Sequence, residues 1–176
     1  MKLLHAIYSG PTQLLEKAKR DGASLVRVLK TCEEREVRDA LFNFAISAYH
    51  IWDWVKAYRP DLEQIVTSLL STSEAIAACR DLSNASKHVT LSLDRGPYLK
   101  HPPVVEEVGI SATARATISE VKDFIRQLDG EVKAPIDSPS WRLKIQLVSG
   151  RRIPAEELVV EVIDVWEQFF NEHGID

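Results

Sequence analysis

The longest helical pattern in the sequence lies in residues 31–60, which read TCEEREVRDALFNFAISAYHIWDWVKAYRP. Thr31 and Glu34 fit a capping box, and a residue that precedes proline disfavours helical backbone. We therefore predict one helix that begins after Thr31 and stops at Arg59-Pro60. Apolar residues recur on two of its faces, which is typical of a central, mostly buried helix. Its remaining stripe consists of Asn43, His50, Asp53 and Trp54.

A second helical pattern follows the capping-box sequence Ser71-Thr72-Ser73-Glu74 and extends to about Lys87. One face of this helix carries small residues, which suit close packing against a neighbouring helix. The opposite side is polar, and its residues at spacings of four form a row along the helix. The polar residues are Arg80, Asn84, Lys87 and His88, with Asp81 at the edge, and the row consists of Arg80, Asn84 and His88.

Three further helices are predicted on either side of these two. Pro11 suits the first position of an N-terminal helix, and Asp21-Gly22 interrupts its pattern, which indicates a kink or two short helices. Residues 61–70 form a short helix. Pro154 opens the last helix, whose broad apolar arc indicates a core or a subunit interface and whose C-terminal cap is Gly174.

Between His88 and the last helix the apolar period changes from helical to two. This alternation predicts strands at 89–93, 108–118 and 141–147, and a short fourth strand at 151–153. Residues 119–128 form a short helix. The predicted fold is α+β and mainly α, a bundle of four to five helices with a small antiparallel sheet inserted before the C-terminal helix. We expect a single domain over 1–176, with a helical part (1–88), a small sheet with a short helix (89–153) and the C-terminal helix (154–174).

The composition narrows the class of protein. The 176 residues include 45% apolar residues, enough for a hydrophobic core, and the formal charge is −4, without the basic excess of a general DNA-coating protein. Two cysteines are too few for a disulfide scaffold. The sequence shows neither a signal peptide nor an apolar run long enough for a membrane span, so we expect a soluble, cytoplasmic protein.

The two polar stripes admit a functional and a structural interpretation. In the functional one, Arg80 and Lys87 hold phosphate oxygens, His88 is a general acid or base, and Asn84 orients the substrate. In the structural one, Arg80 pairs with a nearby aspartate and the polar groups satisfy one another inside the bundle. Sequence alone leaves open whether the stripes face each other and whether the protein is an enzyme.

Arg80-Asp81 followed by His88 resembles the motif of the HEPN superfamily, in which an arginine precedes a histidine late in one helix. Seven residues separate Arg80 from His88, a longer gap than is usual there. Many HEPN proteins are metal-independent ribonucleases of toxin–antitoxin or antiphage systems, with the site formed across a dimer. The resemblance implies Arg80 and His88 as catalytic residues. Asn84, Lys87, Asp81, His50 and Asp53 are the candidate binding or supporting residues.

The segments FNFAISAYHIWDW (42–54) and CRDLSNASKH (79–88) also look like a pair found in small uncharacterised bacterial and phage proteins. The alternative to RNA cleavage or nucleotide binding is a non-enzymatic interaction subunit with a structural polar network. A metal site on His50, Asp53, Asp81 and His88 is a weaker interpretation, so we predict no metal and no cofactor. Expected partners are a second copy or another protein, with RNA as a candidate and no membrane.

Overall fold

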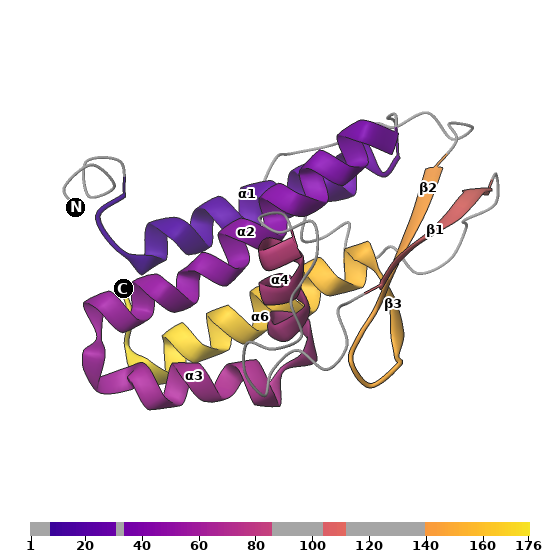
Figure 1. The fold of residues 1–176 in the computed structure, drawn as a ribbon. Helices are drawn as coiled ribbons and strands as arrows, with labels where there is room; N and C mark the ends of the chain where they lie inside the picture. The colour runs from indigo at the N-terminus through magenta and orange to yellow at the C-terminus, as the bar shows by residue number, and fades with distance from the viewer. Residues whose placement is uncertain (1–7, 31–33, 86–103, 112–139) are drawn as a thin grey trace.

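The computed structural model describes residues 8–30, 34–85, 104–111 and 140–176. Within these ranges the chain is mainly helical and holds a small antiparallel sheet before the C-terminal helix, as predicted (Figure 1). The helices are α1 (Pro11–Val28), α2 (Glu34–Tyr58), α3 (Glu63–Thr72), α4 (Glu74–Ala85) and α6 (Ala155–His173), and a 3-10 turn spans Pro60–Leu62. The strands are β1 (Val104–Ser111), β2 (Ser140–Gln146) and β3 (Arg152–Pro154).

The central helix α2 is the one predicted from residues 31–60. Phe44, Ala48, Ile51 and Val55 are completely buried on one face, where they contribute to a core shared by the five helices and the sheet. Its second apolar face is only half-buried, and Trp52 is half-buried as well. The helix ends before Pro60, as the proline rule predicts.

Of the two alternatives predicted for Asp21-Gly22, the two short helices are wrong, because α1 is one helix over Pro11–Val28. Gly22 is buried where α1 meets two other helices. A Cβ atom at this position would lie 2.6 Å from Val159 Cγ1 of α6 and 3.3 Å from ring atoms of Phe44 of α2. The glycine therefore permits close helix packing and does not break the helix.

The start of α4 differs from the predicted capping box. The backbone N–H of Ile76 donates a hydrogen bond to Ser73 Oγ (3.3 Å), so Ser73 caps the helix. Ser71, which the pattern placed at the cap, lies in the last turn of α3 and donates to the carbonyl of Ser68 (2.8 Å). The overlapping Ser-Thr-Ser-Glu residues allowed two cap positions, and the longer α3 selects the later one.

The sheet has the strand order β1-β2-β3, and both pairs are antiparallel. Within β2 and the turn after it, Leu143, Ile145 and Leu147 are buried and Lys144 is exposed, which confirms the alternation that predicted a strand at 141–147. The strand predicted at 108–118 begins earlier, at Val104, and its described part ends at Ser111. The predicted strand at 89–93 and short helix at 119–128 lie outside the described residues.

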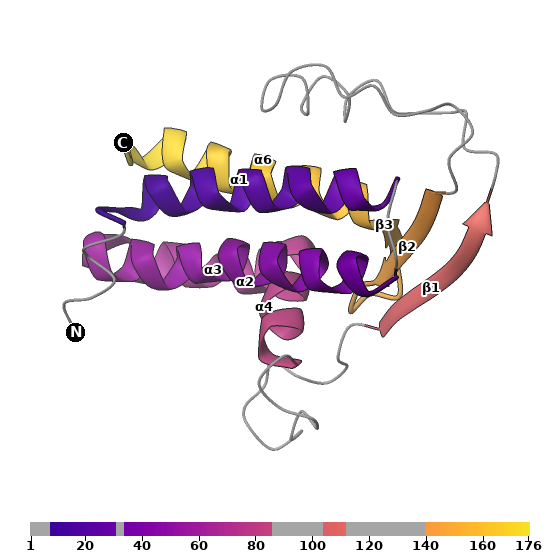
Figure 2. The ribbon, with the colours of Figure 1, turned by 90° about the horizontal axis from the view of Figure 1, so that it is seen from above.

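The apolar arc of α6 packs inside this chain. Trp166, Leu158 and Val162 of α6 are completely buried, and α6 contacts α1, α2, α4 and the strands β2 and β3. Gly174 ends the helix in the left-handed conformation (φ 58°), as predicted. Seen from above, the sheet lies at one end of the bundle and the C-terminus at the other (Figure 2).

A polar site between α2 and α4

The two helices that carry the predicted polar stripes pack against each other. In both ribbon views α4 crosses α2 instead of running alongside it (Figures 1 and 2). Crossing helices meet over a short length, so only part of each stripe reaches the other. We call this meeting point the α2–α4 polar site, and its described members are Tyr49, His50, Asp53, Arg80 and Asp81.

The centre of this site is a buried ion pair on α4. Arg80 Nε donates a hydrogen bond to Asp81 Oδ1 at 2.6 Å. The two residues are 7% and 0% exposed, respectively, although they belong to the polar side of the helix. Removing either partner of such a pair leaves the other charge buried without a counter-ion, which is strongly destabilising. The ion pair therefore keeps both side chains in this position.

The Asp81 carboxylate is only partly satisfied. In the described part of the chain no group donates a hydrogen bond to its second oxygen, Oδ2, which is buried. Burial raises the pKa of Asp81, and the Arg80 guanidinium lowers it by less. The site therefore contains an acidic group that is less acidic than an exposed aspartate, and it has one unused acceptor.

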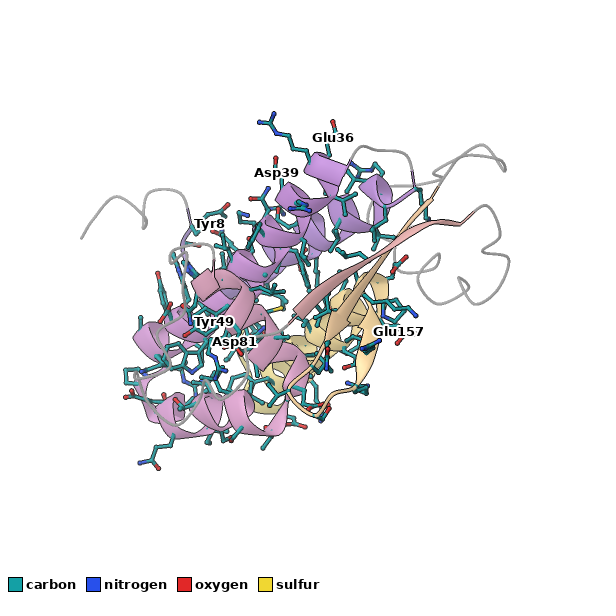
Figure 3. All side chains as sticks on the ribbon, turned by 45° about the vertical axis from the view of Figure 1, so that its right-hand side comes forward. Tyr8, Glu36, Asp39, Tyr49, Asp81 and Glu157 are labelled. Atoms are coloured by element: carbon teal, nitrogen blue, oxygen red, sulfur yellow. The ribbon has the colours of Figure 1, made fainter. Side chains whose placement is uncertain are left out.

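Tyr49 connects the two helices, and the sequence interpretation missed it. Its ring stacks on Trp52 (centroids 5.8 Å apart, planes at 10°) and meets the edge of His50 at 6.2 Å. Burial raises the pKa of the Tyr49 phenol, the charges of Asp53 and Asp81 raise it further, and Arg80 lowers it. The phenol thus lies in the electrostatic field of both helices, and Figure 3 shows Tyr49 and Asp81 next to each other where the helices meet.

Tyr49 could have been found from its spacing. It lies four residues before Asp53, which places the two side chains one helical turn apart on the same face of α2. The apolar pattern concealed this relation, because a tyrosine satisfies a hydrophobic stripe and a polar site equally well.

The other predicted site residues differ in their exposure to solvent. Asp53 is exposed, and His50 and Asn84 are half-buried. Lys87 and His88 lie outside the described residues, so the predicted catalytic pair of Arg80 and His88 remains a prediction.

The β2–β3 turn holds the first turn of α4. The backbone N–H and hydroxyl of Ser149 donate to the two carboxylate oxygens of Glu74, at 2.9 and 3.0 Å. Arg151 makes a two-pronged contact with Glu161 of α6, at 3.0 and 2.8 Å. These contacts connect the helix that carries Arg80 to the sheet and to α6.

A separate polar cluster joins α1 to α2, and the sequence analysis did not identify it. Lys17 Nζ donates to Asp21 Oδ2 (2.5 Å) and to Ser47 Oγ (2.7 Å), and the Ser47 hydroxyl donates to the same Asp21 oxygen. Ser47 is only 3% exposed. Because this hydroxyl is satisfied and inaccessible, we interpret the cluster as a structural link between the helices.

Three further observations concern the described residues. Cys79 is completely buried, and burial raises the pKa of its thiol, so it packs in the core and is not a nucleophile. Among the described residues no group of three histidine, cysteine, aspartate or glutamate side chains is arranged to hold a metal ion. None of the described helices has the length and apolarity needed to span a membrane.

Comparisons with models of protein families, with curated protein sequences and with solved structures gave no significant match.

Proposed function

We propose that this protein binds RNA at the α2–α4 polar site and cleaves it without a metal ion, as the resemblance to HEPN proteins implies. The observation that supports this proposal is the convergence at the site. Arg80 and Asp81, which begin the motif on α4, lie within the electrostatic reach of Tyr49 of α2, and Tyr49 is in turn influenced by Asp53. Ligand sites often lie between the helices of a bundle, where side chains from two elements converge.

In this proposal the ribose 2′-hydroxyl attacks the adjacent phosphorus, and the bond from phosphorus to the 5′-oxygen breaks. The hydroxyl loses a proton, the departing 5′-oxygen gains one, and a cyclic phosphate forms. His88 is the candidate for proton transfer, because an unperturbed histidine titrates near neutral pH. Arg80 stabilises negative charge on the phosphate, and Asp81 positions Arg80 through its Nε.

The direct test is degradation of single-stranded RNA by the pure protein in the presence of a chelator. We expect cleavage by the wild type and its loss in His88→Ala. The matched control is His173→Ala, because His173 is the last residue of α6 and lies 85 residues after His88 in the sequence. Chelator-sensitive cleavage, or cleavage that survives in His88→Ala, would contradict the proposal.

The salt dependence of RNA binding tests the role of Arg80. For single strands, the slope of log affinity against log salt is about −0.7 per phosphate neutralised. If Arg80 and Lys87 both bind phosphate, the slope is about −1.4, and affinity falls about sevenfold between 50 and 200 mM salt. If Arg80 stays with Asp81, we expect a slope of about −0.7 and a fall of about 2.6-fold. The shallower slope would remove Arg80 from the proposed phosphate contacts.

The burial of the ion pair favours a second candidate function. Arg80 is 7% exposed and Asp81 is 0% exposed, which suits a structural network in a non-enzymatic interaction subunit. That function predicts no RNA cleavage and a stable, stoichiometric complex with another protein in a pull-down. Light scattering of the pure protein tests the accompanying proposal of a homo-oligomer, and fractionation of cells tests the proposed cytoplasmic location.

A further inference from the structure

We draw no further inference here: the strongest candidate, the buried side-chain cluster of Arg80 and Asp81 where α4 crosses α2, belongs to the site already described, and nothing in the described residues shows what would bind to the second carboxylate oxygen of Asp81.

Discussion

Replacement of Gly22 by alanine tests whether a single missing side chain sets the distance between α1, α2 and α6. A Cβ atom at Gly22 would lie 2.6 Å from Val159 Cγ1, whereas carbon atoms prefer about 3.5–4.0 Å. Val159 and Phe44 are both 0% exposed, so neither can move into solvent. The overlap must be relieved by a shift of packed helices or by unfavourable rotamers.

The expected effect is the difference between two opposing contributions. Alanine stabilises a helix interior by about 1 kcal/mol relative to glycine. Overpacking of a core costs about 1–3 kcal/mol, and the 2.6 Å contact with a short, branched side chain favours the upper end of that range. We therefore expect Gly22→Ala to lower the free energy of unfolding by about 2 kcal/mol, or the melting temperature by about 4–8 °C.

A double-mutant cycle with Val159→Ala identifies the cause. Val159→Ala alone destabilises the protein, because it removes two buried methyl groups. In its background the atom that the new Cβ would strike is absent, so we expect Gly22→Ala to cost about 1–2 kcal/mol less than in the wild type. Urea unfolding followed by circular dichroism measures all four variants. A more stable Gly22→Ala, or the same loss in both backgrounds, would refute the steric explanation.

Three further predictions concern single groups. In a Cys32→Ser background, a thiol reagent should label Cys79 only as fast as the protein unfolds, and immediate labelling in native buffer would contradict its burial. Burial raises the pKa of Asp81 above its ordinary value of 3.8, so the folded state binds this proton more tightly. As pH rises from 3.8 through the raised pKa, the free energy of unfolding of the wild type should therefore fall relative to that of Asp81→Asn. Urea titrations at several pH values measure this difference. A rise relative to Asp81→Asn would show that the ion pair with Arg80 dominates. Ser149→Ala keeps the backbone bond to Glu74, so we expect thermal unfolding to show a loss of about 0.5–1 kcal/mol, and a loss above 2 would indicate a larger role for this turn.

The helices were predictable from sequence wherever a local signal determines them. The 3.6-residue period located α2 and α6, Pro60 ended the one, and Gly174 capped the other. These signals act within a few residues, so they hold in any tertiary context that buries the same face.

The errors came from positions where a distant contact decides. Gly22 suggests a break when only its neighbours in sequence are considered, and its actual role depends on Val159, 137 residues later. The sequence also left open whether Arg80 contacts a ligand or pairs with a nearby aspartate inside the bundle. Its pairing with Asp81 matches the structural interpretation, and the burial of the pair depends on the crossing of α4 and α2, which no local signal reports.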